Sequence, residues 1–436
     1  MAQTSSAVTR RELVAGIGGL VIGGLGGFLV AGSVPNPTAS SGPARSGGEI
    51  KVAGVFPLSG IIASDGKEMA NGVRMAIDEL NAGGGLLGRM INYVEVDDKD
   101  SSTDQISTAF QRATSVEKPD AIFSGYHLAT GPEFDIVADA GALYYNVNTQ
   151  VAWTKRFTSN PTRYWSIFQT DPTEFWYGTG FANWVDNALK SGQIPAKEKT
   201  TAILAGDDAY DTLIAQTYQQ RMTELGWTVN SKDSFTATNV PDWGPLLSKI
   251  RSNPPTVLFT TDYNPADNAA MVKAWAANPV KTILYQQYGP SVPEYLNLAG
   301  DASNGVIWAT VLGLLTDPLG MDFRSRYQAK YGSAPGWANA GGCYDSVMCW
   351  ANAVVRAGDP KNYKAVAAQT EKLIYRGVTG GISFKDHAGR SYPWETTDPS
   401  LGQPHIIVQL QKGEHKIVFP DPYADGKFQL PSWYAA

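Results

Sequence analysis

The chain has few of the residues that build metal and redox sites. Its 436 residues include only two cysteines, Cys343 and Cys349, and four histidines. The histidines are dispersed, with no H-E-x-x-H motif and no Cys/His ligand spacing. We therefore expect no metal site and no cofactor.

The two cysteines also give little reason to expect a disulfide. They lie six residues apart in one stretch with a helical pattern. At about 100° per residue, they face different directions, so their geometry does not suit an internal bridge. We predict that both are buried as small hydrophobic residues.

Motifs for nucleotide binding and hydrolysis are also missing. There is no G-x-x-x-x-G-K-[ST], no G-x-S-x-G, and no G-x-G-x-x-G after the first predicted strand. The glycines of "NAGGGLLG" follow a predicted helix, where glycine commonly ends the helix. The net charge is −6 and no Lys/Arg-rich run occurs, so nucleic acid is not an expected partner. These absences favour a protein that is not an enzyme.

The first 48 residues differ from the rest. Arg10 and Arg11 precede an uncharged, glycine-interrupted run, so we interpret residues 1–33 as a twin-arginine-type export signal. About 20 apolar residues can also span a bilayer, so a membrane anchor at residues 13–33 is the less favoured alternative, and cleavage is not decided. Residues 34–48 form a Pro/Ser/Gly linker. We expect an exported, periplasmic or otherwise extracytoplasmic protein.

From Gly48 onward the sequence alternates predicted strands and helices. The composition, 43% hydrophobic and 17% charged, suits a globular protein, and the length favours two lobes. Strands alternating with helices of this length predict parallel sheets covered on both faces. Residues 343–358 and 365–377 are predicted as helices. Hairpin-like strands follow in "GGISFKDHAGR" and "HIIVQLQKGEHKIVFP", the latter turning at "KGEH".

Polar residues gather where the predicted strands end. The stretches that follow strands are "PLSG…ASDG", "SGYHLATG", "YNVNTQ", "GDDAYD", "TTDYNPAD" and "YQQYG". In parallel sheets, ligands bind outside the carboxyl ends of the strands. Neutral donors and acceptors with aromatic walls suit a small polar solute that is held and not transformed. We therefore predict a solute-binding cleft, with the loop after the first strand at its mouth.

The opening "IKVAGVFPLSGIIASDGKEMANGVRMAIDELNAGGGLLGRMINYVEVDDKD" resembles the leucine/isoleucine/valine-binding proteins. The resemblance continues through "GDDAYD", "DWGPLLSKIRSNPPTVLFTT" and "VFPDPYADGKFQLPSW", and so covers nearly everything after residue 48. These proteins are the solute receptors of ABC importers for branched-chain amino acids, amides and urea. The resemblance implies a type I periplasmic binding protein fold, in which two doubly wound parallel-sheet lobes are joined by three crossovers. It places lobe 1 at residues 49–170 plus 312–380 and lobe 2 at residues 171–311 plus 381–436.

The same resemblance implies the function and the partners. The chain is expected to capture a small polar solute by hinge closure and to deliver it to an ABC permease in the membrane. An amino acid, an amide, urea or a small organic acid fits this role. The alternatives left open are a ligand-binding sensory receptor domain and an α/β enzyme acting on a small amide. We expect a monomer.

Site residues follow from the family pattern. A solute carboxylate is expected to meet Ala129 and Thr130 and the segment Asn148, Thr149 and Gln150, while Asp262 or Tyr263 closes from the second lobe. The family meets the solute ammonium with an acidic residue, but here the segment contains Gln287 and Tyr288. Since an unpaired buried ammonium is costly, either Asp262 supplies the charge or the solute has none. Asp65 is a further candidate, or else a helix cap.

Overall fold

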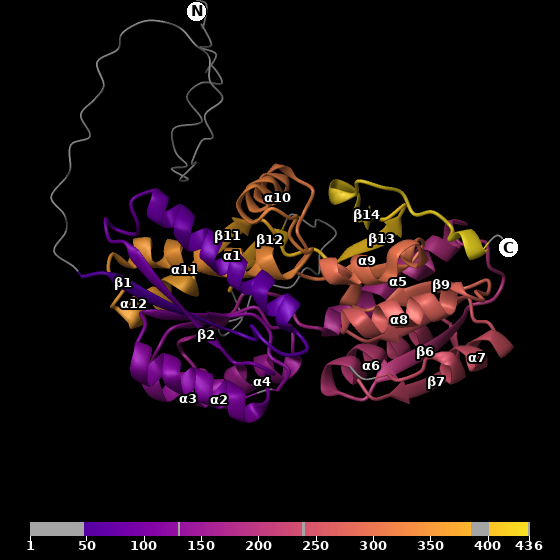
Figure 1. The fold of residues 1–436 in the computed structure, drawn as a ribbon, viewed down its shortest axis with the longest axis horizontal. Helices are drawn as coiled ribbons and strands as arrows, with labels where there is room; N and C mark the ends of the chain where they lie inside the picture. The colour runs from indigo at the N-terminus through magenta and orange to yellow at the C-terminus, as the bar shows by residue number, and fades with distance from the viewer. Residues whose placement is uncertain (1–47, 130, 238–239, 385–400, 435–436) are drawn as a thin grey trace, which may run out of the picture. The chain divides into compact units, whose positions relative to one another are not determined.

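The computed structural model describes residues 48–129, 131–237, 240–384 and 401–434. Residues 45–436 form one compact unit (Figure 1). The predicted export signal at residues 1–33 lies outside the described residues. Its interpretation therefore stays a prediction.

The first sheet has five strands, all parallel, in the order β2-β1-β3-β4-β5. Buried β-branched and aromatic residues dominate its central strands, as expected for a sheet covered on both faces. The strands are β1 (Ile50–Phe56), β2 (Ile91–Asp97), β3 (Ala121–Ser124), β4 (Tyr144–Asn146) and β5 (Ile167–Gln169).

The second sheet has seven strands in the order β14-β13-β10-β9-β8-β6-β7. Strands β6 to β10 run parallel, while β13 is antiparallel to both β10 and β14. The predicted hairpin at "KGEH" is confirmed: Lys412 and Gly413 form its turn, both with positive φ. The strands are β6 (Thr200–Gly206), β7 (Thr228–Phe235), β8 (Val257–Thr261), β9 (Ile283–Gln286), β10 (Ile307–Thr310), β13 (Ile406–Gln411) and β14 (Glu414–Phe419).

Helices cover both faces of the first sheet, and segments far apart in sequence lie side by side there (Figure 1). Helices α1 and α11 pack so closely that a Cβ at Gly72 would lie 2.2 Å from the Ala340 carbonyl oxygen. One face of the sheet carries α1 (Ala63–Ala82), α11 (Asn339–Ala357) and α12 (Tyr363–Thr370). Helix α10 (Pro318–Tyr331) is hydrogen-bonded to α1. The other face carries α2 (Thr103–Arg112), α3 (Pro132–Ala140) and α4 (Val151–Ser159).

The second sheet is covered in the same way. Alternate residues of β6 face opposite layers, Ile203 joining α5 and α6, and Leu204 joining α7 and α8. The predicted doubly wound α/β architecture is therefore confirmed. These helices are α5 (Phe175–Lys190), α6 (Ala209–Glu224), α7 (Gly244–Ser252), α8 (Pro265–Ala276) and α9 (Pro293–Ala299).

The predicted helix at residues 365–377 is wrong in its second half. Helix α12 ends at Thr370, and β11 (Ile374–Gly377) pairs with β12 (Gly380–Ser383). The buried carboxylate of Asp345, in α11, accepts hydrogen bonds from the turn between these strands. This tertiary contact overrides the local helical pattern. The remainder of the predicted strand "GGISFKDHAGR", from residue 385, lies outside the described residues.

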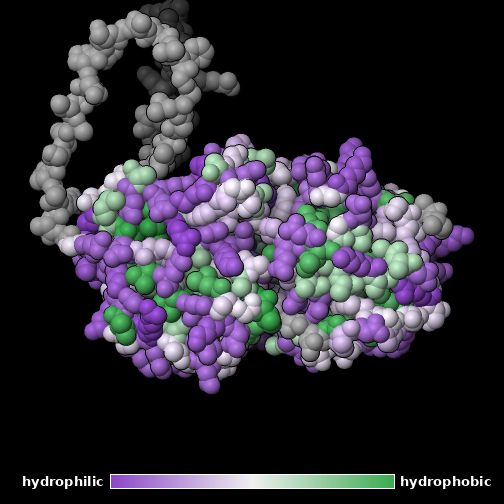
Figure 2. Space-filling model, viewed as in Figure 1, coloured by the Kyte–Doolittle hydropathy of each residue, from purple (hydrophilic) through white to green (hydrophobic). Residues whose placement is uncertain are grey.

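The strands of each sheet fall within the residue ranges predicted for its lobe. The predicted limit at residue 380 falls at the start of β12, so the exact lobe limits stay predictions. Cys343 and Cys349 are both buried and free in α11, as predicted. The face drawn in Figure 2 is widely hydrophilic, with hydrophobic residues in separate patches. No helix in the described ranges is long and apolar enough to cross a membrane.

Candidate functional site

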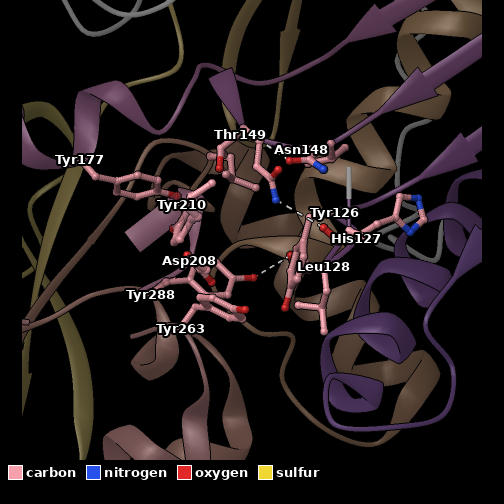
Figure 3. Close-up of a pocket in the computed structure, with 16 residues that line it drawn as sticks. Tyr126, His127, Leu128, Asn148, Thr149, Tyr177, Asp208, Tyr210, Tyr263 and Tyr288 are labelled. Carbon is pink, nitrogen blue, oxygen red and sulfur yellow. Dashed lines mark hydrogen bonds between the residues drawn. The ribbon is translucent and has the colours of Figure 1, made fainter. Parts of the chain in front are cut away.

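A cavity of ≈ 200 Å³ lies where loops from both sheets meet (Figure 3). Segments after β3 and β4 of the first sheet line it together with segments after β6, β8 and β9 of the second. The full lining is Tyr126, His127, Leu128, Ala129, Val147, Asn148, Thr149, Gln150, Tyr177, Asp208, Ala209, Tyr210, Tyr263, Tyr288, Leu312 and Asn339. The carboxyl ends of parallel strands thus face one site, as in open α/β sheets generally.

Five tyrosines form the walls of the cavity. Tyr126 and Tyr288 meet edge to face with ring centroids 6.0 Å apart, and Tyr210 and Tyr263 do so at 5.7 Å. Tyr177 contacts Tyr210 in the same geometry at 6.3 Å. These walls present apolar ring faces together with hydroxyl groups that can donate or accept.

The first sheet contributes hydrogen-bond donors. Asn148 is 1% exposed, and its Oδ1 accepts from the backbone N–H of Gln150 at 3.0 Å. Its Nδ2 has no hydrogen-bond partner within the described part of the chain. A buried amide donor without a partner is costly unless a ligand or water accepts from it. Thr149 adds a hydroxyl group beside it.

The second sheet contributes the negative charge. Asp208 follows β6 and caps α6, accepting at Oδ1 from the backbone N–H of Asp211 at 2.8 Å. Burial raises the pKa of Asp208, and this hydrogen bond opposes the shift. No lysine or arginine is among the described residues that line the cavity. A solute nitrogen is therefore the natural partner for this carboxylate.

Further acids lie buried around the same loops. Burial raises the pKa of Asp262 to about 7 and that of Glu174 to about 8. It also raises the pKa values of Asp171 and Asp211 well above the usual range, and neighbouring carboxylates add to both shifts. A positively charged solute would lower these pKa values, since opposite charges favour ionisation.

Tyr288 joins the cavity to a carboxyl group behind it. Its hydroxyl lies 3.0 Å from Oδ1 of Asp65 in α1 and 2.8 Å from Oδ1 of Asn339 in α11. Asn339 Nδ2 donates to the same Asp65 oxygen at 2.7 Å. Asp65 is buried, which raises its pKa to about 6 against the lowering effect of these hydrogen bonds. A residue after β9 is thus bonded to two helices of the first sheet.

The structure brings most predicted site residues together. Ala129, the segment Asn148 to Gln150, Tyr263 and Tyr288 all line the cavity. The backbone N–H of Ala129, however, already donates to the Ser101 carbonyl at 3.1 Å. Thr130 lies outside the described residues.

Asp65, Asp262 and Gln287 lie outside the cavity lining. Oδ1 of Asp262 accepts from the backbone N–H of Asn264 at 2.9 Å. Gln287 donates to the Tyr210 hydroxyl at 3.0 Å and thereby supports a wall residue.

One expectation about the first loop is corrected. Helix α1 begins at Ala63 with Ile62 at its N-cap, so Asp65 does not cap it. The segment 57–62 is outside the cavity lining, so its place at the mouth of the cleft stays a prediction. It is held at the end of β2, where Asp97 accepts from Leu58 N and Ser59 Oγ, both at 2.9 Å.

Several lining residues were missed from the sequence. Tyr126, Asp208 and Tyr210 lie in strand-end stretches that had been noted as polar, and only their individual roles went unassigned. Tyr177 lies in α5 and Asn339 begins α11, and neither stretch carries a local signal. Their positions depend on how distant helices pack.

Three comparisons place the chain among known proteins. A family model described as periplasmic binding protein matches residues 49–396. A Leu/Ile/Val-binding protein homolog from Brucella melitensis is 24% identical over 417 residues, covering 92% of this chain and 99% of the relative. A Silicibacter pomeroyi crystal structure, titled as a branched-chain amino acid ABC transporter, has 35% identity and a TM-score of 0.82, covering 88% of this chain and 100% of its own.

A more distant structure shares the fold. The branched-chain amino acid transporter substrate-binding protein LivJ of Streptococcus pneumoniae, solved with isoleucine, has 19% identity and a TM-score of 0.71. The match covers 84% of this chain and 97% of that one. The type I periplasmic binding fold expected from the sequence is therefore confirmed.

Proposed function

This chain belongs to the periplasmic binding protein family, and from that membership we propose that it captures a small solute of the amino-acid or amide class in the cavity between its two sheets. It is a solute-binding protein with an extracytoplasmic location, as the family implies. Our proposal goes further in two respects: it names the class of solute, and it includes delivery of that solute to an ABC permease.

The observation that carries the proposal is the polarity of the cavity. Asn148 and Thr149 offer donors on the side of the first sheet, and Asp208 offers a carboxylate on the side of the second. A solute with an oxygen acceptor at one end and an N–H donor at the other satisfies both sides. α-Amino acids and primary amides have this arrangement, whereas a plain organic acid lacks the nitrogen.

Capture then follows from contacts to both lobes. A solute that bonds residues of both sheets favours the closed form by as much as those contacts exceed what the open form allows. Hinge closure around a ligand is the mechanism of periplasmic binding proteins as a class. Closure would let a permease distinguish the loaded receptor from the empty one by shape.

The proposed role includes no reaction. His127 lines the cavity, but Figure 3 shows its ring directed away from the tyrosines. The ring pairs instead with the buried carboxylate of Asp98. It is therefore not placed to act as a base for a solute held between Asn148 and Asp208.

A thermal-shift screen of the purified protein tests this proposal. The panel contains L-leucine, L-isoleucine, L-valine, polar amino acids, short amides, urea and small organic acids. A ligand at 100 times its Kd stabilises the fold by about 2.7 kcal/mol, which raises Tm by a few degrees. Binding of amino acids or amides supports the proposal. Binding confined to organic acids, or turnover of a bound amide, contradicts it.

A further inference from the structure

The hydroxyl of Tyr288 is held in an unusual way. It is a single O–H donor that faces two acceptors, Oδ1 of Asp65 at 3.0 Å and Oδ1 of Asn339 at 2.8 Å. Its proton is therefore directed toward Asp65 in α1 or Asn339 in α11, both on the first sheet. The phenol oxygen keeps its lone pairs, and no donor to it is found among the described residues.

The backbone at this residue is strained. Tyr288 has φ 53° and ψ −49°, and Gly289 N–H donates to the Gln287 carbonyl at 2.6 Å, which closes a γ-turn around it. A bulky residue with positive φ persists only where its surroundings hold it there. In this backbone conformation the phenol ring lies in the cavity wall, edge to face with Tyr126 (Figure 3).

The partner of Tyr288 is a carboxyl group with no cation beside it. Asp65 is 1% exposed and accepts from Tyr288 and Asn339 at Oδ1, while Oδ2 has no hydrogen-bond partner among the described residues. A hydrogen bond to an ionised acceptor is stronger than one to a neutral acceptor. Donation to Asp65 polarises the phenol and makes its oxygen a better acceptor, because hydrogen bonds in a chain reinforce one another.

We propose that Tyr288 is a specificity-determining residue whose oxygen accepts a hydrogen bond from a solute N–H while its own proton is donated to Asp65. The inference rests on the proposed function and deepens it. Such a relay recognises either an ammonium or a neutral amide N–H, and it discriminates against an analogue that lacks the N–H. Asp65 acts through Tyr288 and is a positioning residue.

Isothermal titration of the full chain with matched probes tests the relay. The pairs are L-leucine with 4-methylpentanoate, and butyramide with N,N-dimethylbutyramide, each differing in the N–H group. Y288F keeps the ring and removes the oxygen. We expect Y288F to lower the affinity for the N–H-bearing probe by about 10- to 100-fold, since hydrogen bonds to charged or polarised groups are strong. The affinity for the paired probe without the N–H group should change by less than about 3-fold, since that probe makes no such bond.

D65N provides the second variant. It keeps an acceptor oxygen for Tyr288 but removes the charge, so discrimination between the paired probes should fall by about 3- to 10-fold. Y363F is the matched control, because Tyr363 also donates to a carboxylate, Asp120 at 3.1 Å, and both residues lie outside the cavity lining. It should leave both affinities unchanged.

The outcomes separate the two proposals. If the unaltered protein binds neither N–H-bearing probe nor any other amino acid or amide, the proposed function fails, and the relay fails with it. If it binds one but Y288F weakens both members of a pair equally, Tyr288 is only structural and the relay alone is overturned. Retained discrimination in D65N likewise removes Asp65 from the relay.

Discussion

The hydroxyl of Tyr288, after β9 of the second sheet, lies 3.0 Å from the carboxylate of Asp65 in α1 against the first sheet. The two residues are 223 positions apart in sequence. Their contact joins a residue of the cavity wall to a buried carboxyl group. Burial makes ionisation of this carboxyl group costly. That cost has a measurable consequence for stability.

Asp65→Asn should change how stability depends on pH. Burial raises the pKa of Asp65 from 3.8 to about 6, so the folded state binds a proton that the unfolded state releases. The contribution of Asp65 to the free energy of unfolding is therefore complete below pH 4. It falls by about 3 kcal/mol as the pH rises through 6. Urea unfolding measures this effect. Between pH 4 and 7, the free energy of unfolding of D65N should rise relative to that of the unaltered protein by up to about 3 kcal/mol. D301N, a substitution of the same kind at an exposed position, is the control. A difference between D65N and the unaltered protein that stays constant with pH would contradict the prediction.

Stability of the unliganded protein should also fall between pH 6.5 and 8. Burial raises the pKa of Asp262 and Glu133 to about 7 and that of Glu174 to about 8, and it raises the pKa values of Asp171 and Asp211 well above the usual range. An acid that is protonated only in the folded state costs about 1.4 kcal/mol per pH unit until the pH passes its folded pKa, so Asp262 and Glu133 contribute up to about pH 7 and Glu174 up to about pH 8. The buried His405 and His415, with pKa values lowered to about 3, act only below pH 6.5. Calorimetry should show Tm decreasing throughout this range; a rising Tm would contradict the shifts.

Asp208→Asn should weaken binding without weakening the fold. Asparagine caps a helix as well as aspartate does, so the hydrogen bond from Asp211 N–H is retained. Loss of the charge should lower the affinity for L-leucine by about 10- to 100-fold, as expected for a charged hydrogen bond. Titration calorimetry and thermal melts measure the two effects. Asp207, exposed and outside the lining, provides the control D207N, which should bind normally.

Gly72→Ala should destabilise the packing of α1 on α11. The new Cβ would lie 2.2 Å from the Ala340 carbonyl oxygen, so the helices must separate at a cost of about 1 to 3 kcal/mol. Chemical unfolding measures this loss. Gly83 ends α1 with φ −79° and nothing closer than 3.4 Å, so G83A is the matched control and should be tolerated. Equal stability of the two variants would contradict the close approach.

Replacing Arg10 and Arg11 together by lysine should block export. The twin arginine is the feature by which this class of signal is recognised, and lysine keeps the charge. Cell fractionation of the variant and the unaltered chain measures the effect. Export of both to the same extent would argue for a simple membrane anchor at residues 13–33.

The sequence by itself determined the order of strands and helices, the turn at Lys412 and Gly413, and the polar character of the strand ends. These features depend on local periodicity and turn chemistry, which neighbouring residues specify. They were sufficient for the doubly wound α/β class. They did not reveal β11, because its turn is held by Asp345 from a separate helix.

Only the tertiary structure shows which carboxylate lines the cavity. Asp262 and Asp208 both follow strands of the second sheet, and the sequence offers no way to choose between them. Packing places Asp208 in the cavity lining and leaves Asp262 outside it, bonded to its own loop. The contact of Tyr288 with Asp65 and Asn339 could not be predicted from the sequence either. It joins three distant segments, and only the packing of the two sheets and their helices sets that distance.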